Sequence, residues 1–256
     1  MTSSVLIIEE INEATVLLTL NRPERRNALT IELMDSLCHK FDTLALEPQR
    51  RVVILCGAGS AFCTGLDLKE AADVDLAEQS AECVARTFEV LLRSPLICIA
   101  AAHGATLAGG AGLLACCDLA IASEDLWISF PEVRRGLVPA LVTTVLHDRI
   151  RDRDLRELMF VAEPIDAPRA LAMGLVNQVV PPDRLLLEAR LLADKILKGA
   201  PNTVRQTKKL LRELSGADPL QLFDQALAVH KEARRSPEAG EGLAAFQAKR
   251  EPNWGS

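Results

Sequence analysis

A cluster of glycines in residues 106–118, TLAGGAGLLACCD, constrains this chain more than any other feature. Gly109, Gly110 and Gly112 fall within four positions, and an unbroken apolar run follows them. Glycine inside a helix costs about 0.5–1 kcal/mol relative to alanine, so such a cluster is disfavoured unless something needs the space. The cluster therefore predicts a close approach to this backbone, either by a ligand or by a neighbouring part of the chain.

A second segment, residues 57–71, has the same design as residues 103–118. Each follows a β-like run, passes through small residues and enters a helical pattern. The first N–H groups of a helix lack intrahelical partners, and the helix dipole is positive there. Two such ends brought together form a backbone site for an oxygen that becomes negative during a reaction. We interpret the two segments as the two halves of such an oxyanion site. The alternative is that the glycines only permit tight packing of strand on helix.

Nucleotide binding is a further alternative for the first of these segments. Residues 52–62, VVILCGAGSAF, contain G-x-G-x-x-F, but the third glycine of a dinucleotide-binding loop is missing. The chain also contains no G-x-x-x-x-G-K-[ST] motif. Because a dinucleotide site would leave the second glycine segment unexplained, we favour the oxyanion interpretation.

Strand-like and helical patterns alternate through residues 1–182, which predicts an α/β domain with a largely covered sheet. Thr30 is the expected N-cap of the first helix, and the second helix is expected to end before Pro95. The expected strands begin near the following residues: Thr15, Arg51, Leu96, Leu119 and Leu175.

Residues 183–256 change to a helical period, and we expect this region to support oligomerisation and to cover the site. Its apolar faces exceed what a small α/β core needs to cover, which favours an oligomer. The expected N-caps of its helices are Asp183, Asn202 or Thr203, and Asp218.

The composition disfavours several classes of binding partner. The 256 residues carry a net charge of −6, which disfavours nucleic acid and anionic membranes as partners. The seven cysteines contain no C-x-x-C pair and the four histidines form no metal-ligand spacing, so we expect buried reduced cysteines and no metal. No signal-peptide or transmembrane pattern is apparent, and we expect a cytoplasmic protein.

Glu132, in FPEVRRGLVPA, is the candidate general acid or base. A carboxyl group beside an apolar wall has a raised pKa and suits proton transfer near neutral pH. The alternative is an exposed glutamate paired with Arg134 or Arg135. The wall would consist of Phe130, Val133 and Leu137.

Six stretches, in order along nearly the whole chain, resemble the crotonase (enoyl-CoA hydratase/isomerase) superfamily. The resemblance implies a spiral of ββα units with a helical C-terminal part, assembled as a homotrimer or hexamer. It also implies an acyl-CoA thioester as substrate, with coenzyme A as part of that substrate and no other cofactor. The stretches are LNRPERRNAL, VVILCGAGSAFCTGLDLKE, GGAGLLACCDLAIASED, FPEVRRGLVPA, AMGLVNQVVP and EGLAAFQAKREPNW.

The resemblance also assigns roles to residues. The N–H groups of Leu66 and Gly109 would form the oxyanion hole. Many hydratases of the family carry two catalytic glutamates; the second corresponds to Glu132, and the first corresponds to Gly112, which has no side chain. The implied substrate contacts are Arg25, Ala28, Asp67, Leu68, Gly110 and Lys249.

The missing glutamate leaves three functions open. The first is a hydratase that works with Glu132 and another group that positions water, acting on branched or carboxylated enoyl-CoA. The second is a Δ3,Δ2-enoyl-CoA isomerase, which moves a proton with one carboxylate. The third is a non-catalytic homologue that binds acyl-CoA.

Overall fold

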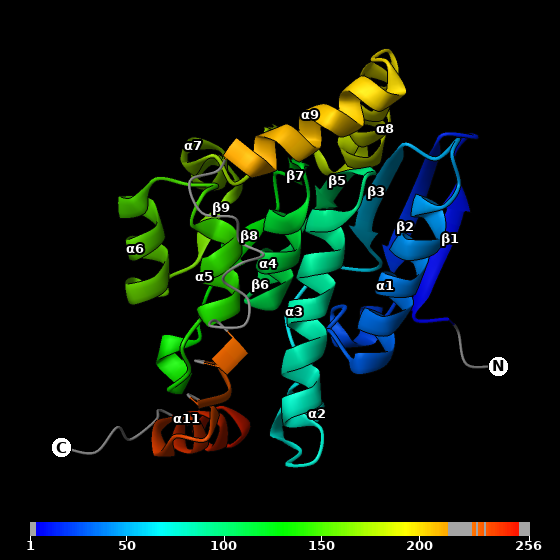
Figure 1. The fold of residues 1–256 in the computed structure, drawn as a ribbon. Helices are drawn as coiled ribbons and strands as arrows, with labels where there is room; N and C mark the ends of the chain where they lie inside the picture. The colour runs from blue at the N-terminus through cyan, green and yellow to red at the C-terminus, as the bar shows by residue number, and fades with distance from the viewer. Residues whose placement is uncertain (1–3, 215–226, 229, 233, 251–256) are drawn as a thin grey trace.

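The computed structural model describes residues 4–214, 227–228, 230–232 and 234–250. A six-stranded sheet runs in the order β1-β2-β3-β5-β7-β10; β1 and β2 pair antiparallel, and the other neighbouring strands pair parallel. Figure 1 shows helices on both sides of this sheet. The strands are β1 (Leu6–Glu10), β2 (Thr15–Leu20), β3 (Val52–Gly57), β5 (Ile97–Ala102), β7 (Leu119–Ser123) and β10 (Gln178–Val180).

The central strands form because their apolar runs can be buried on both faces. Every residue of β5 is buried, as are the first five residues of β3. Parallel strands covered on both sides read as continuous apolar runs. The strands expected from Thr15, Arg51, Leu96, Leu119 and Leu175 are all present.

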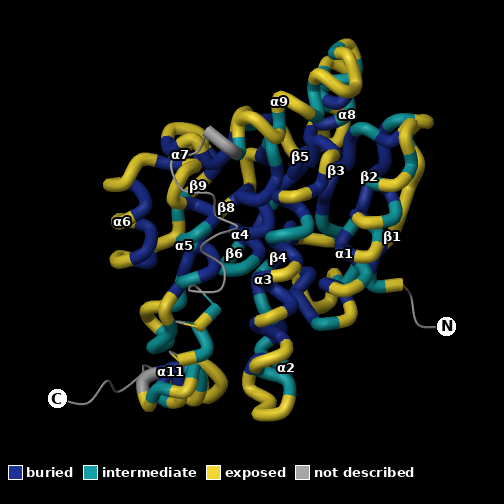
Figure 2. The backbone as a smooth tube through the Cα atoms, viewed as in Figure 1, coloured by how far each residue is buried: buried dark blue, intermediate teal, exposed yellow. Residues whose placement is uncertain are grey.

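Two helices on one face of the sheet follow the sequence patterns closely. Helix α1 (Ile31–Ala45) begins after Thr30, whose Oγ1 accepts a hydrogen bond from the Leu33 N–H. Helix α3 (Ala77–Arg93) ends two residues before Pro95, because proline disfavours helical backbone in the residue that precedes it. Figure 2 shows buried and exposed residues alternating along the backbone of these helices.

In the residues that the structure describes after β10, the regular elements are helices joined by short turns. Helix α8 (Leu185–Leu197) covers the other face of the sheet, with Leu185, Ala189 and Ala193 packed against it. The expected caps here are wrong: Arg184 is the N-cap residue of α8, after the 3-10 turn η3 (Pro182–Arg184), and α9 (Pro201–Leu214) begins ahead of Asn202. Asp218 lies outside the described residues.

A second, four-stranded sheet in the order β4-β6-β8-β9 was not expected from the sequence. Its strands have only two or three residues each, too few to show a period. They are β4 (Ala61–Cys63), β6 (Ala105–Leu107), β8 (Trp127–Ser129) and β9 (Ile165–Asp166). The pairs β4–β6 and β6–β8 are parallel, so the carboxyl ends of these three strands meet at one edge.

The remaining helical segments connect and flank the strands of the two sheets. Figure 1 places α2 and α11 at the same end of the molecule, below the sheets in this view. These segments are η1 (Pro23–Arg25), α2 (Leu68–Ala72), α4 (Gly109–Cys116), η2 (Val133–Arg135), α5 (Ala140–Leu146), α6 (Asp152–Val161), α7 (Ala167–Met173) and α11 (Pro237–Gln247).

Candidate active site

The carboxyl ends of three parallel strands bring the candidate catalytic residues together. Leu66 follows β4, Gly109 follows β6 and Glu132 follows β8, each within three residues of its strand. Register fixes this arrangement, because Leu107 pairs with Ser129 and the Ala108 N–H donates to the Ser129 carbonyl at 2.9 Å. Ligand sites commonly lie beyond the carboxyl ends of parallel strands.

The two glycine segments face each other across a short gap. A Cβ atom placed on Gly109 would lie 4.0 Å from the Leu66 nitrogen, and one placed on Gly65 would lie 3.1 Å from the Gly109 nitrogen. In the part of the chain that the structure describes, neither the Leu66 N–H nor the Gly109 N–H donates a hydrogen bond. Two free backbone donors therefore converge at one place, which is the geometry that an oxyanion requires.

Ala108 holds a strained backbone conformation at this turn. Its φ is 47° and its ψ is −122°, a region that L-residues rarely occupy. Its N–H is bonded to Ser129, and its carbonyl accepts from the Gly112 N–H at 3.0 Å. Such strain persists only where the surroundings enforce it, and it gathers at functional sites. An alanine carries no sequence signal for this role, so Ala108 was missed.

Glu132 presents a buried carboxyl group without a partner. Its backbone carbonyl is held by the N–H groups of Arg135 and Leu137 at 2.9 and 3.0 Å. Its Oε2 is buried and accepts no hydrogen bond from any residue that the structure describes. Burial raises the pKa of Glu132 from 4.5 to about 7, although its own backbone and the charge of Arg135 oppose that shift.

The alternative interpretation, in which an exposed Glu132 pairs with Arg134 or Arg135, does not fit the described residues. Arg134 forms an ion pair with Glu163 at 2.5 Å, on the exposed side of the turn. The guanidinium of Arg135 lies 4.2 Å from the centre of the Phe246 ring. The carboxyl group of Glu132 is therefore available for proton transfer.

A cavity of about 330 Å³ unites these groups. Leu66, Gly109 and Glu132 all line it, as do four of the expected substrate contacts: Arg25, Ala28, Asp67 and Leu68. Apolar residues from α3 and α5, among them Val84 and Leu141, complete the lining. Helices α3 and α5 thus line the same cavity as Leu66, Gly109 and Glu132.

The rim near Leu66 is held by a charged pair and by an asparagine. Arg22 forms an ion pair with Asp67 at 2.9 Å, and Asp67 also caps α2 by accepting from the Lys69 N–H. Burial raises the pKa of Asp67, but the hydrogen bonds from Arg22 and Lys69 outweigh it and hold the pKa below its usual value. The Asn27 side chain donates to the carbonyls of Ala58 and Ala61 at 2.9 and 2.7 Å.

Comparison with known proteins decides the family. Residues 10–256 match the family model described as enoyl-CoA hydratase/isomerase. The chain belongs to this family. It is 35% identical over 240 residues to a Thermus thermophilus protein named as an enoyl-CoA hydratase, covering 92% of this chain and 95% of the relative. It is 33% identical over 254 residues to the mevalonyl-coenzyme A hydratase of Aspergillus fumigatus, and the match covers 93% of this chain and 90% of that relative.

Solved structures agree with this assignment and confirm the expected α/β crotonase-like fold. An enoyl-CoA hydratase/isomerase from Pseudoalteromonas atlantica T6c superposes with a TM-score of 0.89 at 28% identity, covering 98% of this chain and 100% of that one. The protein is therefore an enzyme of the enoyl-CoA hydratase/isomerase family.

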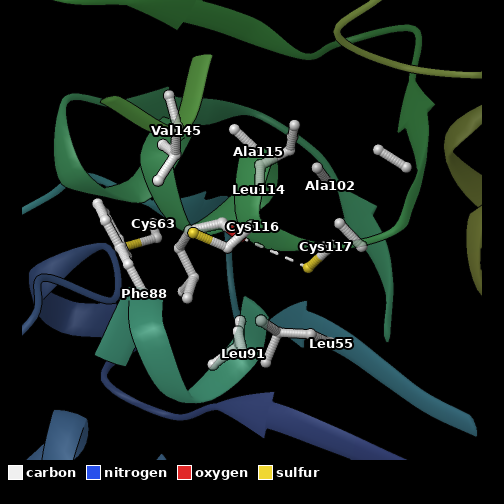
Figure 3. Packing of buried hydrophobic residues seen from close by; sticks show 14 of the residues in the cluster. Leu55, Cys63, Phe88, Leu91, Ala102, Leu114, Ala115, Cys116, Cys117 and Val145 are labelled. Carbon is white, nitrogen blue, oxygen red and sulfur yellow. Dashed lines mark hydrogen bonds between the residues drawn. The ribbon is translucent and has the colours of Figure 1, made fainter. Parts of the chain in front are cut away.

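The space beside Gly112, where the resemblance led us to expect the family's first glutamate, is filled by neighbouring side chains. A Cβ atom placed on Gly112 would lie 2.5 Å from Phe88 Cζ, 2.9 Å from Phe88 Cε2 and 3.0 Å from Val142 Cγ1. Figure 3 shows Phe88 and Leu91 of α3 and Val145 of α5 around the residues of α4. Gly112 thus allows α3 and α5 to pack closely against α4, and a larger residue there requires Phe88 to move.

Two expected substrate contacts lie outside the cavity lining. Gly110 is buried, and a Cβ atom on it would lie 2.1 Å from the Cys63 carbonyl oxygen, so its role is to let α4 pack against β4. Lys249 is exposed just beyond α11 with φ of 51°. Its contact with a coenzyme A phosphate stays a prediction, as does assembly into a trimer or hexamer.

Other sequence expectations can be compared with the described residues. All seven cysteines are buried and none forms a disulfide. Within the described ranges, no group of three or more His, Cys, Asp or Glu side chains is placed to hold a metal ion. In the same ranges, no helix combines the length and apolar character needed to cross a membrane.

Proposed function

We propose that this enzyme acts on acyl-CoA thioesters, with the N–H groups of Leu66 and Gly109 as its oxyanion hole and Glu132 as its single acid/base. The observation that carries the proposal is the buried, unpartnered Glu132 carboxyl in the same cavity as the two free N–H groups. An oxyanion hole stabilises the enolate that forms when a proton leaves the carbon next to a thioester carbonyl.

The proposed proton transfer follows from the negative charge of the Glu132 carboxylate and the two N–H donors beside the thioester oxygen. The carboxylate of Glu132 accepts a proton from carbon, and the electron pair of that C–H bond moves onto the thioester oxygen beside Leu66 and Gly109. The protonated Glu132 then returns the proton to carbon. A pKa of about 7 lets both forms of Glu132 exist near neutral pH, which suits such a two-way transfer.

We assign the reaction to the enoyl-CoA hydratase type, in which water adds across the double bond. The names of the relatives from Thermus thermophilus and Aspergillus fumigatus support this assignment. With Gly112 in place of the first glutamate, the Glu132 carboxylate accepts a proton from water as the water oxygen bonds to the far carbon of the double bond, and the electron pair of that double bond moves onto the thioester oxygen. The protonated Glu132 then delivers this proton to the carbon next to the carbonyl. A branched or carboxylated enoyl-CoA remains the proposed substrate class.

A Δ3,Δ2-enoyl-CoA isomerase is the second candidate, and one observation favours it. Phe88 and Val142 occupy the space into which a side chain at position 112 would extend. Glu132 then moves a single proton between two carbons and needs no second carboxylate.

A substrate screen tests the proposal. Short, branched and carboxyl-terminated 2-enoyl and 3-enoyl CoA thioesters are followed by the ultraviolet absorbance of the conjugated double bond. We expect Glu132→Gln to lower turnover by about 10²–10⁴, the usual share of general acid–base catalysis. Glu124→Gln, at an exposed residue of the β7–β8 turn, is the matched control. Unchanged turnover of every thioester by Glu132→Gln would contradict the proposal.

A further inference from the structure

A cluster of basic side chains lines one part of the cavity and has no role in the chemistry described so far. Arg135 comes from η2, and His230 and Arg234 come from the C-terminal region. All three are half-buried. We call these three residues the basic cluster.

The basic cluster has no acidic partner within the ranges that the structure describes. His230 Nε2 is buried without a hydrogen-bond partner, and burial lowers the pKa of His230 to about 4, with the charge of Arg234 adding to that effect. Burial alone lowers the pKa of Arg234. Arg135 feels the charge of Glu132 but forms no ion pair with it; its guanidinium stacks on Phe246.

Some other cations with little exposure are neutralised by an acidic residue, and Arg51, Arg205 and Arg212 donate to backbone carbonyls. By contrast, no hydrogen bond or ion pair is found for the side chain of Arg135 or Arg234 among the described residues. Arg22 pairs with Asp67 at 2.9 Å, Lys208 pairs with Asp118 at 2.8 Å, and Arg50 pairs with Glu47 at 2.8 Å. A buried cation without a counter-ion is costly, so it is retained where a ligand supplies the anion. Guanidinium groups are well suited to a carboxylate, because they can bind both of its oxygens.

The location of the basic cluster indicates which anion it meets. Arg135 lies three residues after Glu132 on the same turn, close enough for the charge of Glu132 to act on it. The exposed cations Arg25 and Lys69 line the cavity near Leu66 instead. The proton-transfer group acts on the acyl carbons, so a cluster beside Glu132 serves the acyl part of the substrate.

We propose that the basic cluster binds a carboxylate at the far end of the acyl group, which makes CoA monothioesters of dicarboxylic acids the preferred substrates. This inference rests on the proposed function in that the ligand is an acyl-CoA thioester. Apolar side chains of Leu137, Val138 and Leu243, which line the same cavity, contact the chain between the two ends.

Matched substrates and a neighbouring control residue test this inference. The preference is the ratio of kcat/KM for an enoyl-CoA ending in a carboxylate to kcat/KM for the methyl-ended analogue of equal length. Hydrogen bonds to charged groups give about 10–100-fold, so we expect this preference in the unmodified enzyme and its loss in Arg234→Gln. Arg235→Gln removes an exposed arginine that lies 3.6 Å from Glu78, and the preference should persist there.

Binding measurements separate this inference from the proposed function. The increase in the unfolding temperature caused by each thioester reports binding without turnover. A larger increase for the carboxyl-ended thioester, reduced by Arg234→Gln, supports the inference even if no thioester reacts. An enzyme that prefers neither thioester in binding or turnover overturns it.

Two further results overturn the inference. If Arg234→Gln weakens both thioesters equally, and removal of the ribose phosphate from coenzyme A abolishes that effect, the basic cluster binds a coenzyme A phosphate instead. If Arg234→Gln fails to fold, Arg234→Met and Arg234→Ala, which also remove the positive charge, take its place. An undiminished preference in both of these variants then contradicts the inference.

Discussion

The part of the cavity wall that carries Leu66 and Gly109 is built from backbone, whereas the part around Glu132 is built from side chains. In the backbone wall, closely packed turns and a strained Ala108 fix the positions of two N–H groups. In the side-chain wall, polar atoms of Glu132 and His230 are buried without partners. In the proposed function, the backbone wall holds the negative charge, and the side-chain wall provides proton transfer and selectivity.

We therefore expect the two walls to respond differently to amino-acid substitutions. A substitution in the backbone wall acts on activity or on folding depending on which way the added atoms point. A substitution in the side-chain wall leaves the packing intact and changes protonation or substrate choice.

Substitutions of the two adjacent glycines should have different effects: the one at Gly109 should lower activity, and the one at Gly110 should lower stability. A Cβ atom on Gly109 meets only ordinary contacts of 3.6–4.0 Å and points toward Leu66 N, so Gly109→Val should fold but lose about 10²–10³ in rate. A Cβ atom on Gly110 would overlap the Cys63 carbonyl, so Gly110→Ala should lose about 1–3 kcal/mol or more of unfolding free energy. Denaturant unfolding and turnover, measured on both variants, check this; a Gly109→Val enzyme with parental turnover would show that Gly109 is not at the carbonyl.

In the side-chain wall, the titration of Glu132 should make the stability of the protein depend on pH. The pKa of Glu132 is about 7 in the folded protein against an ordinary 4.5, so its proton stabilises the fold fully below about pH 4.5. That contribution is lost as the pH rises through about 7, which costs on the order of 3 kcal/mol. The glutamine in Glu132→Gln does not titrate. The unfolding free energy of this variant should therefore rise relative to that of the parent protein between pH 4.5 and 8. Parallel stability curves for the two proteins would contradict the raised pKa.

A carboxylate added at position 112 should be blocked by packing. Gly112→Glu places its side chain against Phe88 and Val142 and should lower the unfolding free energy by about 1–3 kcal/mol. The same change made in a Phe88→Leu background should cost less, with a coupling of about 0.5–3 kcal/mol in a double-mutant cycle. If this double variant also gains hydration activity, the space at position 112 limits the reaction. Additive effects would mean that Phe88 does not obstruct position 112.

Sequence patterns were sufficient for the main sheet and for the components of the backbone wall. Long apolar runs such as β3 and β5 can be recognised because covered parallel strands have little polar interruption. The glycine segments predicted a close approach, and the structure divides that approach into an open place at Gly109 and tight packing at Gly110 and Gly112.

The remaining features could not be predicted because they depend on contacts between distant residues. Strands β4, β6 and β8 have three residues each and become a sheet only through their register. The basic cluster joins Arg135 to Arg234, which share no local pattern. The cap expected at Asp183 failed because a 3-10 turn over Pro182–Arg184 moves the start of α8 to Leu185.

The central claim is that Glu132 moves protons at a carbon whose carbonyl oxygen sits at Leu66 and Gly109. Exchange of the hydrogen next to the thioester carbonyl with deuterium from D2O, followed by NMR on a bound acyl-CoA, tests it without assuming hydration or isomerisation. The account predicts enzyme-dependent exchange that Glu132→Gln reduces by about 10²–10⁴ while the thioester still binds. Exchange at the parental rate in Glu132→Gln would contradict it.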